Sequence, residues 1–249
     1  LELGKKEGRN VLCCAARLDK TAVLVTGSNR GLGLELVRQL AGRSNPPKGS
    51  LPFAGTQLDP VPQDLKNLAA EHPQIVIITL DTNDPCSVKA AAAKVTELLK
   101  GAGLNLLVNN AGILKLSTVE TETPENMSEV YKTNVIGPMI VSQAFLPLLR
   151  EASQKSPQKG MSCSKAAILN ITSECGSMTN LFAWHMNELI SYRCSKVRTS
   201  WRKRAFVIIN VKGKNFNFTF SYRQCWTYEH HRARVGFHWF RPVQANRLL

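Results

Sequence analysis

One segment constrains the fold of this 249-residue chain more than any other: residues 21–33, which read Thr-Ala-Val-Leu-Val-Thr-Gly-Ser-Asn-Arg-Gly-Leu-Gly. Its apolar run at residues 22–25 predicts a buried strand, and the periodicity of residues 32–40 predicts a helix directly behind it. The turn between them contains Gly27, Gly31 and Gly33. Residues without a Cβ let the backbone bend sharply and approach a pyrophosphate at the helix N-terminus, where N–H groups and the dipole favour an anion. The turn therefore predicts a dinucleotide site, with a glycine-rich loop that binds nothing as the alternative.

The bulk properties fit one α/β domain with a sizeable core, because 43% of the residues are apolar. No apolar run approaches the roughly 18 residues that a membrane span needs. The first residues show no basic region followed by an apolar core, so a secretory signal is not expected. The 7 cysteines are scattered and form no Cys-x-x-Cys pair, which favours the reduced thiols of a cytoplasmic protein over a disulfide framework or a metal site.

Charge and aromatic content divide the chain at Lys196. Residues 197–249 hold 11 Lys and Arg against one acidic residue, and they also hold 11 of the 17 aromatic side chains. Residues 1–20 are mixed and show no pattern. We therefore expect three parts: a leader at 1–20, a dinucleotide-binding catalytic domain at 21–196, and a basic, aromatic-rich tail at 197–249.

Alternating apolar and helical segments predict an α/β fold, a doubly wound parallel sheet of the Rossmann-like kind. A second strand is expected near residues 51–55, although Pro52 weakens it. Further strands are expected at residues 75–80, 104–108 and 166–171, and helices at residues 64–70, 87–99 and 139–149, with another that opens at Pro124. Residues 151–164 are polar and are expected to loop outward.

Polar and small residues follow the predicted strands at their carboxyl ends, where doubly wound sheets bind ligands. Asp81 and Thr82 follow the third strand, Asn109-Asn110-Ala111-Gly112 follows the fourth, and Thr172-Ser173 follows the fifth. The small residues after the fourth strand therefore predict a ligand crevice at this edge. Asp81 can be an acid that caps the helix beginning near Pro85, and the resemblance described below offers a cofactor contact as the alternative.

A Tyr and a Lys stand four residues apart in Tyr192-Arg-Cys-Ser-Lys196, so a helix places both on one face. A free Tyr has a pKa near ~10, and a nearby ammonium lowers it by roughly 1–3 units. This brings the phenol towards use as a general acid or base. Ser173 can donate a hydrogen bond to a carbonyl oxygen as that oxygen gains charge. Asn134 is a polar residue in an apolar helical segment, which predicts a hydrogen bond to the backbone or to water.

In this order, the motifs resemble those of the short-chain dehydrogenase/reductase family, whose glycine turn has the spacing Thr-Gly-x-x-x-Gly-x-Gly. The resemblance covers about residues 20–196 and is nearest to carbonyl-reductase-like and C-factor-like members. It rests on the glycine turn, on Asn-Asn-Ala-Gly and on the Tyr-x-x-x-Lys pair. The long gap between Ser173 and Tyr192 indicates an inserted loop around residues 180–187.

The resemblance implies an NADP(H)-dependent oxidoreductase that interconverts a small carbonyl and an alcohol by hydride transfer. It implies that Tyr192 moves the proton, that Lys196 tunes it and holds ribose, that Ser173 polarises the carbonyl, and that Asn134 holds a water in the relay. The cofactor contacts that it implies come from Gly27, Ser28, Asn29, Arg30, Gly31, Leu32, Gly33, Asp81, Thr82, Asn110, Ala111, Gly112, Tyr192 and Lys196. No metal is implied.

The choice between the two cofactors depends on the ribose 2′-position. Arg30 favours NADP over NAD, because guanidinium recognises phosphate well. NADP-preferring members often carry a second Arg after the second strand, where this chain has Thr56-Gln57. The acidic residue expected there for NAD is also missing, unless Asp59 reaches back.

The resemblance stops after Lys196. The tail contains no Pro-Gly loop, since its only proline is Pro242, followed by Val243. We therefore expect the C-terminal strands and helix of the family to be truncated or replaced. The family's dimer helix is cut short too, which leaves open whether the chain is a homodimer.

Three interpretations of the tail compete. The first is a translated intron, in a catalytically impaired splice or truncation variant. The second is a non-enzymatic binder whose tail contacts nucleic acid through basic and aromatic residues such as Trp201, Phe218 and Trp226; it is not favoured, because no known module fits. The third is partial rescue, in which a helix at 188–204 and a strand at 205–211 form a right-handed crossover beside the fifth strand, with another strand within 215–222.

Overall fold

The computed structural model describes residues 22–42, 51–157, 165–176 and 188–199, together with the backbone of two short strands farther along. Strands and helices alternate along the chain as the sequence predicts. The first half contains β1 (Ala22–Val25), α2 (Gly31–Ala41), β2 (Leu51–Thr56), α3 (Gln63–Glu71), β3 (Val76–Thr79), α4 (Pro85–Leu99) and β4 (Leu106–Asn109). The second half contains α5 (Pro124–Tyr131), a π-helical turn (Lys132–Ile136), α6 (Gly137–Lys155), β5 (Ala167–Asn170), a 3₁₀ turn (Glu174–Gly176), α7 (Ile190–Thr199), β6 (Phe206–Ile208) and β7 (Thr219–Phe220).

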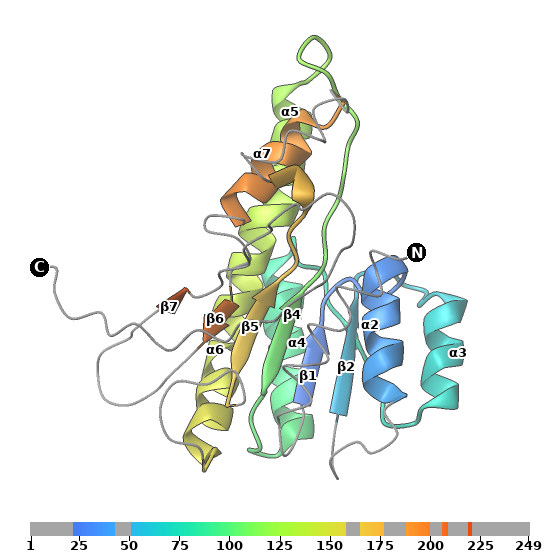
Figure 1. Cartoon of the computed structure of the whole chain (residues 1–249). Helices are drawn as coiled ribbons and strands as arrows, with labels where there is room; N and C mark the ends of the chain where they lie inside the picture. Colours follow the sequence, from blue (N-terminus) through green and yellow to red (C-terminus); the bar gives the residue numbers. More distant parts are fainter. Residues whose placement is uncertain are drawn as a thin grey trace, which may run out of the picture.

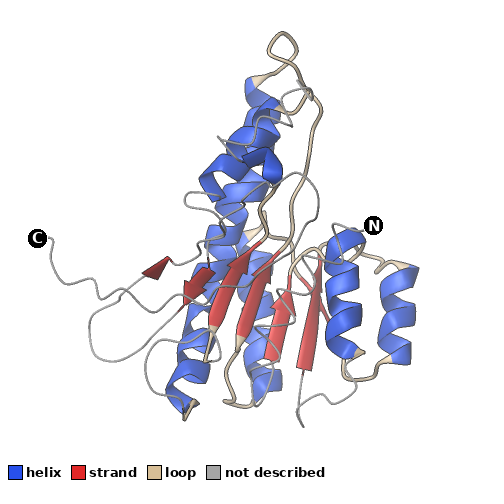
Figure 2. Ribbon diagram, viewed as in Figure 1, coloured by secondary structure: helices blue, strands red, loops and turns tan. Residues whose placement is uncertain are grey.

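Five parallel strands form most of the sheet, in the order β3-β2-β1-β4-β5, with β3 at one edge. The chain first builds outward from β1 to β3 and then crosses back to place β4 on the other side of β1. Figure 2 shows the strands side by side with their carboxyl ends pointing the same way. The predicted doubly wound, Rossmann-like fold is confirmed, and β1 and β4 flank the point at which the strand order reverses.

Alternating strand residues supply a hydrophobic core on each face of the sheet. Leu24 and Leu107 face α4 and α6, where Phe145 is fully buried. Val25 and Val108 face α2 and α3 on the opposite side. The helices thus cover both faces of the sheet, as Figure 1 shows. This two-sided burial explains why the strands read as continuous apolar runs.

The structure extends or adjusts two of the expected elements, β2 and α6. Pro52 lies inside β2, but β2 begins to pair with β3 only at Phe53, so the missing N–H falls before the strand has a neighbour on that side. The expected loop at residues 151–164 is wrong in its first part, because α6 continues to Lys155. Lys155 bonds Glu151 one turn earlier and also the carbonyl of Gly101, and these contacts stabilise the last turn.

The expected right-handed crossover beside the fifth strand is also wrong. A strand does lie there, but β6 runs antiparallel to β5, with Leu169 opposite Phe206 and Ala167 opposite Ile208. A helix of 10 residues is about 15 Å long and lies beyond the carboxyl ends of the strands (Figure 1), so the chain re-enters the sheet from that edge. β7 then pairs antiparallel with β6, which confirms a further strand within 215–222.

Other expectations lie outside the described residues: the leader at 1–20, the inserted loop around 180–187, and the tail residues Trp201, Phe218 and Trp226. None of the helices in the described part of the chain combines the length and the apolar character needed to cross a membrane.

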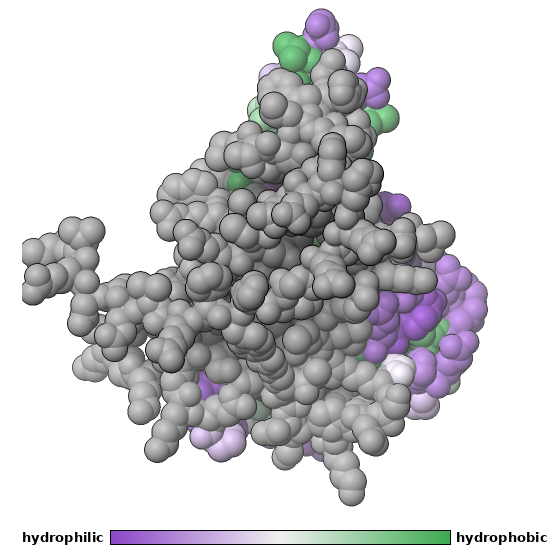
Figure 3. All heavy atoms as spheres, in the orientation of Figure 1, coloured by the Kyte–Doolittle hydropathy of each residue, from purple (hydrophilic) through white to green (hydrophobic). Residues whose placement is uncertain are grey.

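Helices α5 and α7 lie beyond the carboxyl ends of the strands and form a projection above the sheet (Figure 1). Leu114, Leu116 and Val119 are exposed in the segment that leads from β4 to α5. Figure 3 shows apolar and hydrophilic side chains interleaved at the tip of this projection, whereas the face near α2 and α3 is mainly hydrophilic. On the face that Figure 3 draws, the tip of the projection is therefore more apolar than the region near α2 and α3.

The buried ring of Phe145 gives a direct test of the core between the sheet and α6. Phe145→Ala should lower the free energy of unfolding by about 3–5 kcal/mol, since it removes apolar contacts and leaves a cavity. Urea denaturation followed by circular dichroism measures the loss. Met139→Ala is the matched control, because this side chain is 60% exposed on the same helix and should change stability by no more than about 0.5 kcal/mol. Equal effects of the two variants would contradict the assigned core.

Candidate active site

Thr26, the residue after β1, joins the glycine turn to the turn after β4. Its hydroxyl accepts hydrogen bonds from the backbone N–H groups of Asn110 and Ala111, at 3.1 and 3.0 Å. In the other direction, the Asn110 amide donates to the carbonyls of Thr26 and Gly27, at 3.0 and 3.1 Å. The two turns that carry most of the predicted cofactor residues are therefore held together. Sequence reasoning did not single out Thr26, because its partners are more than 80 residues away.

The glycines of the turn have different physical reasons to be glycine. A Cβ on Gly33 would lie 2.1 Å from the Gly27 carbonyl oxygen and 2.5 Å from the Asn110 amide nitrogen, so no side chain fits. Gly27 has a φ of +64°, and its Cβ would lie 2.8 Å from the Ala111 Cα. Gly31 has a φ of +57°, but open space surrounds the position of its Cβ. The turn is thus closed towards the protein and open at Gly31.

The open side of the turn coincides with the N-terminus of α2. Arg30 is the exposed N-cap residue, its side chain makes no capping hydrogen bond, and the first turn of α2 carries no acidic residue. The N–H groups of this turn are therefore available for an anion. Ser28 is buried and bonds inward to Val25, whereas Asn29 is half-buried and Leu32 is exposed. These features fit a dinucleotide phosphate held at the open side of the turn, beside Gly31 and the first N–H groups of α2.

Asp81 and Thr82 follow β3, at the same carboxyl edge of the sheet as the glycine turn. The Asp81 carboxylate accepts the Asn83 N–H at 2.8 Å, and Thr82 is buried against Gly137 at the start of α6. The alternative interpretation of Asp81 as a helix cap is wrong, because Asp84 caps α4 by accepting the N–H groups of residues 86 and 87. Asp81 instead shapes the turn that follows the strand.

Asn134 lies in the π-helical turn between α5 and α6 and is buried. Its amide donates to the carbonyl of Ile113 and to the hydroxyl of Ser195, each at 2.9 Å, and its oxygen accepts the Ile113 N–H. The side chain thus bonds the backbone just after Gly112, as its sequence context predicts. Single π-helical turns inside helices are rare, and those that do occur are often found at functional sites.

Tyr192 and Lys196 share one face of α7, with the Lys196 Nζ 5.5 Å from the centre of the Tyr192 ring. Lys196 is buried, and its ammonium donates to the carbonyl of Ile171 at 3.1 Å. A Cβ on Gly112 would lie 3.1 Å from the Asn134 oxygen and 3.7 Å from the Lys196 Nζ. The structure therefore brings Gly112, Asn134 and Lys196 to one point, with Tyr192 beside them.

Ser173 lies in the turn after β5, against which α7 packs. Its hydroxyl accepts the N–H of Cys175 at 3.2 Å, so the hydroxyl keeps its own hydrogen to donate. Gly176 lets this turn pack closely against α7, because a Cβ on Gly176 would lie only 2.5 Å from the Lys196 carbonyl oxygen. The structure thus places Ser173 and the Tyr–Lys helix at the same corner of the sheet.

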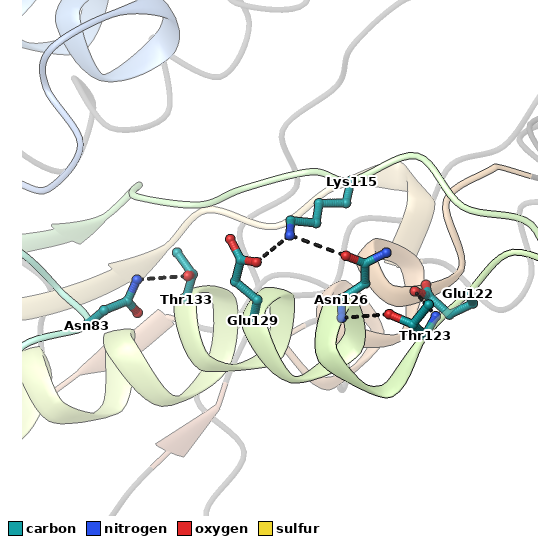
Figure 4. A network of polar contacts seen from close by, with 7 residues as sticks. All are labelled: Asn83, Lys115, Glu122, Thr123, Asn126, Glu129 and Thr133. Atoms are coloured by element: carbon teal, nitrogen blue, oxygen red, sulfur yellow. Dashed lines mark hydrogen bonds and ion pairs between the residues drawn. The ribbon is translucent and has the colours of Figure 1, made fainter.

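Glu122 is a residue of this region that the sequence motifs did not reveal. Its carboxylate accepts hydrogen bonds from the hydroxyl of Ser117 and from both the N–H and the hydroxyl of Ser191, directly before Tyr192. Figure 4 shows Glu122 next to Thr123, which caps α5, while Lys115 reaches over to Asn126 and Glu129 on that helix. No local signal could have found Glu122, since Ser191 is 69 positions away.

The surroundings of Glu122 keep it ionised. The hydrogen bond from Ser117 and then that from Ser191 lower the pKa of Glu122 from its ordinary value of 4.5 to about 2. Because the pKa is lower in the folded than in the unfolded chain, the resulting stabilisation is complete above about pH 4.5. It is lost as the pH falls towards 2.

Comparison with known proteins identifies the family. The profile described as "short chain dehydrogenase" matches residues 21–198, and the chain belongs to this family. The resemblance predicted from the motifs is therefore confirmed. The chain is 31% identical to an uncharacterised oxidoreductase of Schizosaccharomyces pombe over 62% of its length, and 34% identical to a short-chain dehydrogenase of Aspergillus terreus over 72%. It spans 54% and 36% of these two relatives, respectively.

Solved structures give a more specific likeness. The NADPH-bound carbonyl reductase from chicken fatty liver is 51% identical, with a TM-score of 0.68 over 74% of this chain and 68% of that one. The carbonyl reductase Sniffer of Drosophila melanogaster is 31% identical, with a TM-score of 0.65 over 72% of this chain and 70% of that one. The chain is thus similar to carbonyl reductases in both sequence and fold.

Gly33→Ala tests the contact between the two turns. The added methyl would collide with a backbone carbonyl that cannot move without breaking the Asn110 hydrogen bonds, so the free energy of unfolding should fall by at least about 2 kcal/mol. Gly42→Ala is the control, because its Cβ would lie 3.2 Å from the Arg38 carbonyl at ordinary φ and should change stability by less than about 1 kcal/mol. Thermal and urea unfolding measure both. A Gly33→Ala variant as stable as the wild type would refute the packing.

Proposed function

We propose that this chain is an NADP(H)-dependent oxidoreductase that interconverts a small carbonyl compound and its alcohol. The observation that carries the proposal is the meeting of Gly112, Asn134 and Lys196, with Tyr192 beside them, at the carboxyl edge of the sheet. The likeness to the NADPH-bound carbonyl reductase from chicken fatty liver supports the same activity. The cofactor-binding catalytic domain comprises residues 21–196, and the basic tail follows it.

The glycine turn would hold the cofactor pyrophosphate, with backbone N–H groups of α2 pointing at it. Arg30 is exposed at this N-terminus and would bind the ribose 2′-phosphate, which favours NADP over NAD. An acidic residue at the end of β2, which would favour NAD, is missing: Thr56 is buried there, and its hydroxyl accepts the Leu58 N–H. Asp81 and Thr82 would border the adenine side, and Asn110, Ala111 and Gly112 the ribose.

In the reduction direction, NADPH held by the glycine turn would supply a hydride to the carbonyl carbon. Tyr192 donates its phenolic proton to the carbonyl oxygen, which becomes the alcohol oxygen. The ammonium of Lys196 stabilises the negative charge that remains on the phenol, and its position beside Gly112 suits contact with the ribose hydroxyls. Burial of Lys196 strengthens this electrostatic effect.

Ser173 and Asn134 complete the site. The Ser173 hydroxyl, fixed by the Cys175 N–H, donates its hydrogen to the carbonyl oxygen and stabilises the charge that develops on it. Asn134 fixes the backbone after Gly112 and, through a water, would return a proton to Tyr192 by way of Lys196. The likeness to carbonyl reductases favours this enzyme over a non-enzymatic binder that acts through its tail.

Tyr192→Phe tests the proposed chemistry. The variant should lose about 10²–10⁴-fold in kcat for the reduction of aldehydes and ketones, because the proton donor is removed. NADPH oxidation followed by absorbance measures the rate, and NADPH fluorescence should show unchanged cofactor binding. Tyr131→Phe removes the same hydroxyl from a half-buried Tyr at the end of α5 and serves as the control. A Tyr192→Phe variant with wild-type kcat would exclude Tyr192 as the proton donor.

A further inference from the structure

Two buried serines each precede a residue of the Tyr–Lys pair by one position. Ser191 and Ser195 are 2% and 0% exposed, and they stand four residues apart, so they share one face of α7. Tyr192 and Lys196 share the adjacent face, about 100° further round the helix. Whatever holds the two serines therefore fixes the rotation of α7 about its axis, and with it the direction in which the Tyr192 Cα–Cβ bond points.

Both serines form hydrogen bonds with polar side chains from the segment that contains α5 and the π-helical turn. At the C-terminal end, the Asn134 amide donates to the Ser195 hydroxyl at 2.9 Å. At the N-terminal end, the Glu122 carboxylate accepts from the Ser191 N–H at 3.1 Å and from its hydroxyl. Tyr192 lies between these two hydrogen-bonded serines, one residue after Ser191.

The Glu122 carboxylate acts as a distant cap of α7. The Ile190 N–H donates to the Ser117 carbonyl, the Ser191 N–H donates to Glu122, and the first internal helical bond joins Arg193 to Leu189. Two N–H groups that the helix itself cannot satisfy thus find partners outside it. A negative charge at a helix N-terminus is also favoured by the helix dipole.

Glu122 is itself held in place. Its N–H donates to the Thr118 carbonyl at 2.9 Å, and its second carboxylate oxygen accepts the Thr123 N–H at 3.0 Å. Thr123 in turn caps α5, so the Glu122 side chain lies between the N-termini of two helices. Its remaining partner, Ser117, also pairs through its backbone with residues 188–190.

We propose that Glu122 is a positioning residue that sets the orientation of Tyr192 by clamping the first turn of α7. This inference rests on the proposed function, since it gives Tyr192 the proton-donating role. Without the Glu122 carboxylate (the clamp), the first turn of α7 keeps the hydrogen bond from the Ile190 N–H to Ser117 but loses those from Ser191, directly before Tyr192. Lys196 is held separately, by the Ile171 carbonyl and by the turn around Gly176. Loss of Glu122 therefore acts on Tyr192 more than on Lys196.

The test compares Glu122→Ala, Glu122→Gln and the control Glu125→Ala, which removes an exposed carboxylate from the first turn of α5. Glu122→Ala should lower kcat roughly 10–100-fold, because small displacements of a reacting group are costly, while the Kd for NADPH changes by less than about threefold. Glu122→Gln should recover part of the rate, since one amide oxygen can still accept from Ser191. Glu125→Ala should keep the wild-type kcat.

Amide hydrogen exchange separates this inference from the proposed function. In Glu122→Ala, the amides of residues 191–194 should exchange at least about tenfold faster, while those of β1 and β4 stay protected. If the wild type shows no carbonyl reduction, the proposed function fails, yet the exchange data still report on the clamp. Unchanged exchange in Glu122→Ala overturns the clamp. An equal loss of kcat and NADPH affinity in both Glu122 variants, with faster exchange throughout the sheet, also overturns the positioning role and makes Glu122 a general stabiliser.

Discussion

The close approach of two backbone turns, after β1 and after β4, is the constraint on which the rest of the structure depends. The Cβ position of Gly33 lies only 2.1 Å from the Gly27 carbonyl oxygen, and the Asn110 amide bonds the carbonyls of Thr26 and Gly27 at the same place. This contact locks β1 beside β4, where the strand order reverses, and it opens the N-terminus of α2 towards the carboxyl edge of the sheet. A side chain larger than glycine at Gly33 would force the two turns apart.

The second half of the site depends on how α7 is held over that edge. Its internal hydrogen bonds define a helix but not the direction that Tyr192 faces. That direction is set by contacts made at Ser191 and Ser195 with Glu122 and Asn134, and by the packing of Gly176 against Lys196. The proposed cofactor cradle and the proposed proton-transfer pair are thus built from segments that meet only through tertiary contacts.

Much of the fold could be predicted from local sequence, because buried parallel strands read as apolar runs and the glycine turn requires residues without Cβ. The motifs also placed Asn134, Tyr192 and Lys196 in one region. The role of Glu122 could not be predicted, because an acid followed by Thr-Pro is typical of an ordinary helix start and its partner Ser191 is 69 positions away. The direction of β6 could not be predicted because it depends on where the shortened α7 ends relative to the sheet, and not on the composition of the strand.

The tail contains no Pro-Gly loop, so the proposed cofactor site must form without one. A fluorescence titration of the purified, folded chain with NADPH and with NADH tests this site most directly. We expect saturable binding that is tighter for NADPH, with the preference lost in Arg30→Ala. A chain that is folded by circular dichroism but binds neither nucleotide would contradict the proposed cofactor site.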